Sequence, residues 1–143
     1  MDKETLIRGL NIDLSHEYQA VIMYTTYGSR VSGIHRRELR AFFEAEIPDE
    51  LQHAQFLADK IAALNGQPVT QPQDVHQTDD PKKMLENVLK AESETITRYV
   101  ERRKQAEEYG DYGLVNELED IISDETNHKE ETEKILRGHW GQN

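Results

Sequence analysis

Two short segments of the sequence carry the same acidic and histidine residues at the same spacing. Residues 49–53 read DELQH and residues 124–128 read DETNH, so a glutamate stands three positions before a histidine in each segment. On a helix, this spacing places both side chains on one face. The 143-residue chain has no cysteine, so carboxylate oxygens and imidazole nitrogens are its strongest potential metal ligands. Each segment therefore indicates half of a divalent-metal site.

The doubled motif belongs to a longer repeat. When each residue of 1–68 is compared with the residue 75 positions later, 12 of the 68 pairs are identical, whereas chance gives about four or five for a typical composition. Glu17 and Glu92 form one such pair, and each precedes the glutamate of its motif by 33 residues. Tyr24 and Tyr99 form another. The two halves therefore look like copies of one helical hairpin.

The two additional glutamates follow apolar residues at helical spacing. Leu10 and Leu14 precede Glu17, and the matching leucines precede Glu92. A buried carboxylate without a partner is costly, whereas several carboxylates can be stabilised together around cations. Two hairpins related by a pseudo-twofold axis would bring six ligands to the bundle centre, namely Glu17, Glu50, His53, Glu92, Glu125 and His128. The alternative is that each glutamate–histidine pair is an ordinary surface pair on a helix.

The predicted ligand set is rich in oxygen and contains no sulfur. Four carboxylates and two neutral imidazoles carry a formal charge of −4, which two divalent ions balance. Such ligation suits iron or manganese, and open coordination positions would admit oxygen or hydrogen peroxide. The pattern thus predicts a two-metal centre that can deliver two electrons to an oxidant. Loading should release protons, because repulsion among the carboxylates raises some of their pKa values.

Further polar residues lie near the predicted ligands. Tyr24 and Tyr99 each follow a lone glutamate by two helical turns, where a phenol either packs in the core or donates to a ligand carboxylate. Asp49 and Asp124 directly precede the motif glutamates. They either contact the ligands from behind or are plain surface acids, and we expect the surface for both. The remaining histidines have no matched partner, and we expect them at the surface or at helix ends: His16, His35, His76 and His139.

Apolar periodicity predicts helices and no strands. Pro48 lies inside one helical stretch, where a kink or bulge is expected. Short turns join the first helix to the second and the third to the fourth, whereas residues 65–80 read as an extended connection. We predict one all-α domain over residues 1–143, a four-helix bundle of two antiparallel hairpins joined by a long crossover. The expected helices run from Lys3 to Arg30, Arg36 to Leu64, Pro81 to Glu108 and Leu114 to Arg137.

The composition indicates which kinds of binding partner the protein favours. The formal net charge is −11, which opposes binding to nucleic acid or to an anionic membrane surface and favours the attraction of cations. The sequence has no apolar run of about 18 residues. Its first residues lack the basic and apolar regions of a signal peptide. We therefore expect a cytoplasmic protein.

The motifs resemble those of the ferritin-like di-iron carboxylate family, and bacterioferritin-type subunits in particular. NIDLSHEYQAVIMY and IPDELQHAQFLADKI are similar to the ligand segments of the first two helices, and LENVLKAESE and ISDETNHKEETEKIL to those of the last two. The resemblance implies a di-iron cofactor and a ferroxidase that oxidises Fe(II) with oxygen or hydrogen peroxide, coupled to storage if a cage forms. Two alternatives are a non-storing di-iron peroxidase or oxidase and a structural bundle that binds metal without turnover.

The sequence departs from the bacterioferritin pattern at two places. Leu51 occupies the position of the haem-ligating methionine, so no haem is expected. The chain ends in RGHWGQN without room for a fifth helix, which favours a dimer or a smaller shell over a 24-subunit cage. Apolar residues that cannot all face one bundle centre predict a homo-oligomer. They are Val21, Ile22, Tyr27 and Phe42 or Phe43.

Overall fold

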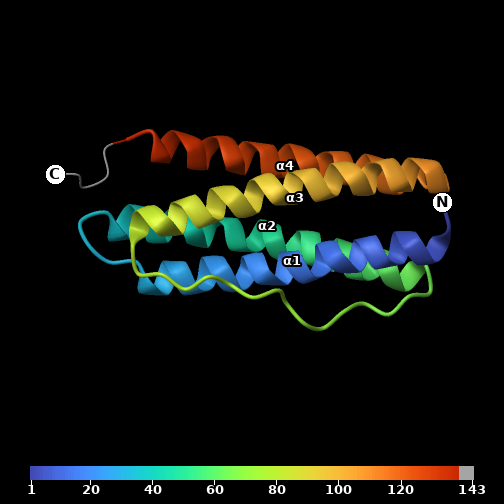
Figure 1. Ribbon diagram of the computed structural model, residues 1–143, viewed down its shortest axis with the longest axis horizontal. Helices are drawn as coiled ribbons and strands as arrows, with labels where there is room; N and C mark the ends of the chain where they lie inside the picture. The colour runs from blue at the N-terminus through green and yellow to red at the C-terminus, as the bar shows by residue number, and fades with distance from the viewer. Residues whose placement is uncertain (139–143) are drawn as a thin grey trace.

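The computed structural model describes residues 1–138, and this part of the chain forms a bundle of four long helices (Figure 1). The predicted all-α fold of two antiparallel hairpins and a long crossover is confirmed. Each helix boundary lies within two residues of its expected position. The observed helices are α1 (Lys3–Arg30), α2 (Arg36–Ala63), α3 (Pro81–Tyr109) and α4 (Tyr112–Leu136).

Aspartates begin three of the four helices. The carboxylates of Asp2, Asp80 and Asp111 accept hydrogen bonds from backbone N–H groups in the first turns of α1, α3 and α4. These caps satisfy backbone donors that have no partner within the helix. Gly110 ends α3 with φ 92°, a left-handed conformation that glycine adopts without steric cost. The hairpin turn between α3 and α4 is therefore fixed by local sequence.

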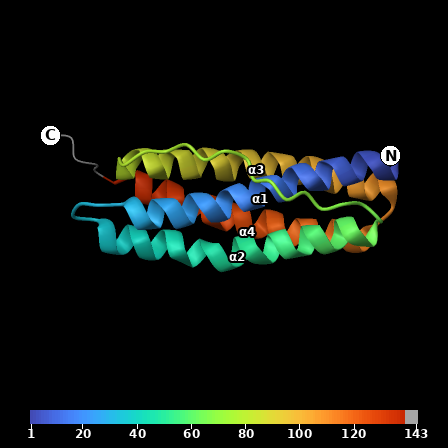
Figure 2. The same cartoon turned by 90° about the horizontal axis from the view of Figure 1, so that it is seen from below.

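The crossover between the hairpins runs in extended form along the outside of α1 (Figures 1 and 2). The backbone N–H of Gln73 donates to the Ser15 carbonyl at 3.2 Å, and that of Val69 donates to Asn11 Oδ1 at 2.9 Å. This segment returns the chain to the opposite end of the bundle, so that α3 starts beside the end of α1. The second hairpin is thus positioned against the first.

The core consists of two apolar clusters separated along the bundle. One cluster packs leucines of α1 against the end of α2 and the start of α4. The other packs Tyr24, Tyr27 and Phe43 against the first turns of α3. The section between the two clusters is polar, and it is where the predicted ligands lie. α2 remains α-helical through Pro48.

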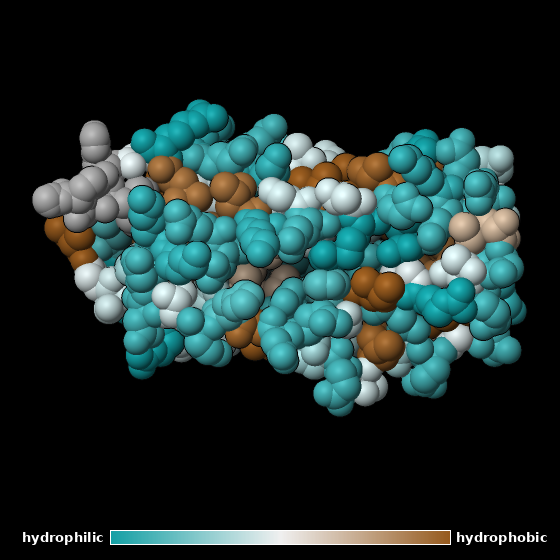
Figure 3. Space-filling model, in the orientation of Figure 1, coloured by the Kyte–Doolittle hydropathy of each residue, from teal (hydrophilic) through white to brown (hydrophobic). Residues whose placement is uncertain are grey.

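The molecular surface is mainly polar, with separate apolar patches (Figure 3). Tyr27, one of the residues expected beyond the core, is instead fully buried against Phe43. Of the alternatives Phe42 and Phe43, Phe43 is buried and Phe42 is partly exposed. Ile22 is 42% exposed and lines a shallow groove with Leu51, which is 52% exposed. Within the described residues, no helix is both long and apolar enough to span a membrane.

Candidate metal centre

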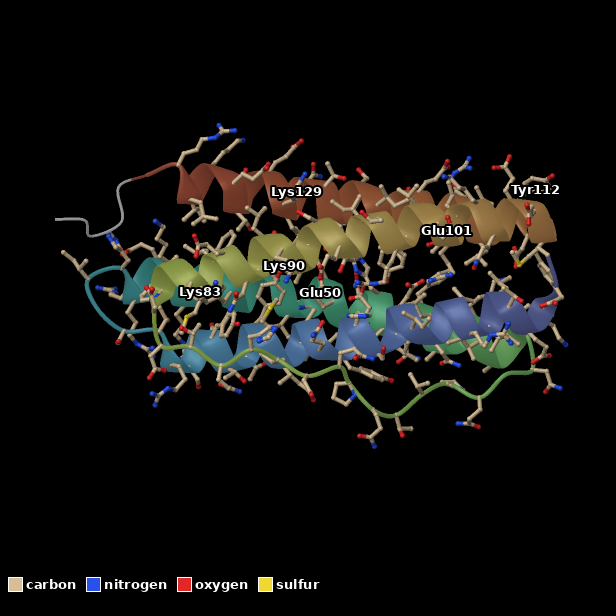
Figure 4. The ribbon with its side chains drawn as sticks, viewed as in Figure 1. Glu50, Lys83, Lys90, Glu101, Tyr112 and Lys129 are labelled. Atoms are coloured by element: carbon tan, nitrogen blue, oxygen red, sulfur yellow. The ribbon has the colours of Figure 1, made fainter. Side chains whose placement is uncertain are left out.

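Four of the six predicted ligands come together in one buried group. Glu17 of α1, Glu50 and His53 of α2 and Glu125 of α4 each place a ligand atom within 4.8 Å of the others. His53 Nδ1 lies 3.4 Å from Glu125 Oε1, 3.6 Å from Glu17 Oε1 and 3.9 Å from Glu50 Oε1. Helical spacing explains the local part of this arrangement, since Glu50 and His53 share one face of α2. Figure 4 shows Glu50 about midway along α2.

His128 lies in a second group, on the neighbouring side of Glu50. Its Nδ1 is 2.7 Å from Glu46 Oε2 and 3.9 Å from Glu50 Oε1. Glu46, Asp49 and His128 also present ligand atoms within 4.8 Å of one another. Glu50 Oε1 is therefore equally far from the Nδ1 atoms of the two histidines, and Glu50 lies between the two groups.

Glu92, the sixth predicted ligand, is buried on α3 but belongs to neither group. Its Oε2 accepts a hydrogen bond from the Tyr24 hydroxyl at 3.1 Å. Burial raises the pKa of Glu92 to about 8, although hydrogen bonds from Thr132 and Tyr24 act in the opposite direction. Without metal, this carboxyl therefore holds its proton near neutral pH.

The two tyrosines contact ligand carboxylates of the opposite half. Tyr24 of α1 donates to Glu92 of α3, and Tyr99 of α3 donates to Glu17 of α1 at 2.6 Å. Burial and the nearby carboxylates raise both phenol pKa values well above their ordinary value. Both phenols thus stay protonated and remain donors. The two rings pack in the apolar core, and their hydroxyls donate to predicted ligand carboxylates.

The expectation that Asp49 and Asp124 are plain surface acids is wrong. Each is about half exposed, but Asp49 Oδ2 lies 3.1 Å from His128 Nε2, and Asp124 Oδ2 lies 3.3 Å from His53 Nε2. A carboxylate on the outer nitrogen fixes the orientation of an imidazole and leaves the other nitrogen facing the ligands. The contacts are again crossed, each aspartate meeting the histidine of the other half. Aligning one half of the sequence with the other cannot reveal contacts between the halves.

The centre contains a group of buried polar atoms without hydrogen-bond partners. Within residues 1–138 the buried side-chain atoms without a well-aligned hydrogen bond are Glu17 Oε2, Glu46 Oε2, Glu50 Oε1, His53 Nδ1, Glu92 Oε1, Glu125 Oε1 and His128 Nδ1. Two of them, Glu46 Oε2 and His128 Nδ1, still form an ion pair at 2.7 Å. Buried polar groups are normally satisfied, and a concentration of exceptions requires an explanation. All seven atoms are potential metal ligands. The residues present therefore fit one or more bound cations.

Protons offset part of the charge of the cluster in the absence of metal. Burial, with the Glu17 and Glu125 charges, raises the pKa of Glu50 well above its ordinary value. Burial lowers the pKa of His53, but Glu125 and Glu17 outweigh this effect and raise the pKa to about 10. For Glu17, burial is outweighed by contacts with His53 and Glu50, so its pKa is lowered. A metal ion must displace the bound protons.

Glu46 was missed by the sequence comparison. It is buried and lies beside His128, but the residue 75 positions later is Ile121, so the repeat gives no signal for it. The pKa of His128 is about 9, because the nearby carboxylates, Glu46 first, outweigh the lowering effect of burial. The signal that could have found Glu46 is its spacing of four residues before Glu50 on the same helical face.

The other histidines that the structure describes belong to neither ligand group. His16 is half-buried on α1, His35 precedes α2 at its start, and His76 is exposed in the crossover. His35 and His76 agree with the expectation of surface or helix-end positions, whereas His16 lies within α1 and is only partly exposed. His139 lies outside the described residues.

Comparison with known proteins identifies related chains. Residues 7–138 match the Ferritin family, described as a ferritin-like domain. A bacterioferritin from Desulfovibrio desulfuricans is 28% identical over 127 residues, covering 88% of this chain and 71% of that protein.

Two solved structures share the fold over nearly the whole chain. A ferritin-like, di-iron-carboxylate protein from Bacillus anthracis str. Ames is 48% identical with a TM-score of 0.93, covering 95% of this chain and 99% of the other. A dodecameric thioferritin, the bacterioferritin-related protein of Bacteroides fragilis, is 28% identical with a TM-score of 0.87. That match covers 96% of this chain and 87% of the other.

Proposed function

The chain belongs to the ferritin-like family, and from this premise we propose that it is a ferroxidase whose two-iron centre is formed by Glu17, Glu50, His53, Glu92, Glu125 and His128. The net reaction oxidises two Fe(II) ions to Fe(III) and passes two electrons and two protons to oxygen or hydrogen peroxide. The products are hydrogen peroxide and water, respectively.

The observation that carries the proposal is the concentration of unsatisfied buried ligand atoms at the bundle centre. A structural role alone would not place several carboxylates and two imidazoles together at this depth, because their desolvation is costly. The similarity to a di-iron-carboxylate protein at 48% identity supports iron over other divalent metals.

The residues of the chain have distinct proposed roles. Glu50 stands between the two histidines and holds both halves of the centre together. Asp49 and Asp124 orient the imidazoles, and the Tyr24 and Tyr99 hydroxyls orient the two lone glutamates. The bound iron pair would supply the two-electron chemistry. The protons that Glu50 and its neighbours release on loading are available for reduction of the oxidant.

Titration of the metal-free protein with ferrous iron under anaerobic conditions tests the proposal. We expect saturation at two ions per chain, followed by rapid oxidation when oxygen or hydrogen peroxide is added. Saturation at one ion, or the absence of tight binding, would contradict the paired centre. Tight binding of two ions without oxidation would favour a structural metal-binding bundle.

We also propose that the protein is a homo-oligomer. The exposed apolar side chains of Ile22 and Leu51 line one groove across α1 and α2, and apolar patches of this kind usually mark an interface. The B. fragilis relative is dodecameric, which supports a shell smaller than a 24-subunit cage.

Light scattering together with iron content after aerobic loading would separate storage from turnover. A large assembly holding far more than two irons per chain indicates storage, whereas a dimer that stops at two indicates a non-storing oxidase or peroxidase. A monomer at micromolar concentration would refute the interface. That haem is not bound stays a prediction, to be checked by adding haem and recording its absorption spectrum.

A further inference from the structure

The contact between α1 and α3 beside Glu17 contains a buried ion pair. Arg102 Nε donates to Asp13 Oδ2 at 2.7 Å, and Arg102 Nη2 donates to Asp13 Oδ1 at 3.2 Å. Both residues are buried. An ion pair at this depth loses so much solvation energy that an apolar pair of similar volume is often as stable. Overall stability therefore does not by itself account for its presence.

The fold makes specific room for this pair. Gly9 lies one helical turn before Asp13, and a Cβ atom at Gly9 would overlap the guanidinium of Arg102. Arg102 Nη1 also donates to Gln105 Oε1 at 2.7 Å. The guanidinium is thus held between α1 and α3 in one orientation. Such a planar, bidentate contact fixes geometry as well as charge.

The ion pair lies one helical turn from two residues of the metal centre. Asp13 precedes Glu17 by four residues on α1, and Arg102 follows Tyr99 by three residues on α3. Tyr99 donates to Glu17 at 2.6 Å. An ion pair and a hydrogen bond therefore join α1 to α3 at adjacent turns. A shift of α1 along α3 would therefore disturb the Asp13–Arg102 pair and the Tyr99–Glu17 hydrogen bond together.

The other half of the repeat has no such ion pair. The residue equivalent to Asp13 is Val88, and the residue equivalent to Arg102 is Tyr27, whose hydroxyl makes only neutral contacts. The arrangement of the proposed ligands also differs between the two halves. Glu17, beside the ion pair, belongs to the compact group of four ligands, whereas its repeat partner Glu92 does not.

We propose that Asp13 and Arg102 are positioning residues for the half-site that contains Glu17 and His53, and that this half-site takes the first of the two metal ions. The inference rests on the proposed two-metal function. A ligand set that is already assembled binds more tightly, because less conformational freedom is lost on binding. Neither residue is expected to touch the metal.

Anaerobic titration of the metal-free protein with Co(II), followed by visible absorption and calorimetry, tests the assignment. We expect two resolved steps in the wild type. In the double variant Asp13→Asn/Arg102→Met, the first step should weaken by about 10-fold, the lower end for loss of a residue that orients a ligand, while the second step stays unchanged. Tyr27→Phe, the matched control in the other half, should leave the first step as in the wild type.

The double variant removes both charges of the bidentate pair together. Arg98, whose Nε lies 4.0 Å from Asp13 Oδ1, also loses its carboxylate partner, but its side chain is partly exposed to solvent. Arg102→Lys keeps the positive charge and should recover part of the lost first-step affinity. Equal weakening of both steps, or unchanged titration of the double variant, would overturn the inference. If the double variant fails to fold, as judged by circular dichroism, a first step in Arg102→Lys that matches the wild type would overturn it. Failure of the wild type to bind two Co(II) ions would instead contradict the proposed function.

Discussion

His53 and His128 occupy equivalent positions in the two hairpins, but their inner nitrogens have different neighbours. His53 Nδ1 faces Glu125, Glu17 and Glu50 at 3.4 to 3.9 Å. His128 Nδ1 has Glu46 at 2.7 Å, and Glu50 is farther away at 3.9 Å. One half of the centre is assembled around proposed ligands, whereas the other is engaged with a carboxylate that has no counterpart in the repeat.

The difference shows that a repeated motif fixes which ligands are present but not how they are arranged. The proposed ligands, their tyrosine partners and the aspartates that contact the histidines are identical in both halves. The residues that differ, such as Glu46 against Ile121, lie one turn away along the helices. Unequal surroundings therefore turn a nearly symmetric ligand set into two distinct half-sites.

The largest effect is expected at the two glutamates of the repeated motif. Glu50→Ala and Glu125→Ala should each abolish fast ferrous oxidation, with a loss greater than the about 10- to 100-fold typical of outer-shell residues. Folding should survive, because one member of a repulsive carboxylate cluster is removed. Stopped-flow absorbance measures the rate, with exposed Glu44→Ala as the control on α2. Similar losses in all three variants would show that helix stability had been measured instead.

The aspartates behind the histidines should act on one half each. Because the contacts are crossed, Asp49→Ala should weaken the half-site of His128, and Asp124→Ala that of His53, by about 10- to 100-fold in metal affinity. Stepwise Co(II) titration separates the two effects, with exposed Asp120→Ala as the control. If each variant weakened the half-site on its own hairpin, the crossed arrangement would be wrong.

Glu46→Ile makes the two halves alike at the position where they differ most. Removal of Glu46 should lower the pKa of His128 from about 9 and so reduce the competition between protons and metal. We expect the second metal to bind about 10-fold more tightly at pH 7. A fall in the His128 pKa from about 9 to its ordinary value of about 6.5 would relieve the competition from protons by less than about 100-fold at that pH. The gain should shrink at pH 9. Weaker second-step binding would identify Glu46 as a ligand.

Gly9 and Gly28 lie on the same helix but have different surroundings. Gly9→Ala should lower the free energy of unfolding by about 1–3 kcal/mol, because its Cβ would displace the guanidinium of Arg102. Gly28→Ala has ordinary contact distances and should instead raise it by up to about 1 kcal/mol through helix propensity. Urea unfolding of both variants measures the two changes in the free energy of unfolding. Equal changes would mean that Arg102 relaxes freely.

The smallest effect concerns pH and the metal-free protein. The pKa values of Glu92 and His128 are raised to about 8 and about 9, so the folded state binds more protons than the unfolded state. Stability from these groups is complete below their unfolded values and is lost as pH rises toward about 9. We expect the metal-free protein to melt a few degrees lower at pH 9 than at pH 6. The stabilisation by added Co(II) should grow over the same range, and a rise in metal-free melting temperature would contradict this account.

Much of the fold could be predicted from local sequence. Aspartate caps, Gly110 and the apolar period fix the helix ends within two residues, because these signals act over a few positions. The six proposed ligands could be chosen because the repeat marks them twice. The roles of Asp49 and Asp124 could not be predicted, since each contacts a histidine more than 70 residues away. Tyr27 was misplaced for the same reason, because its burial depends on Phe43 and the crossover.

The crossover has no helix or strand of its own, yet its length is constrained at many points. Surface loops usually accept inserted residues, because closure entropy grows slowly with loop length. Here the segment is held at intervals along α1, by Asn11, Ser15, Gln19, Tyr27 and Arg30. One inserted residue would shift every later attachment relative to the helix. The length of the crossover thus sets the position of the second Glu-x-x-His motif relative to the first along the bundle axis.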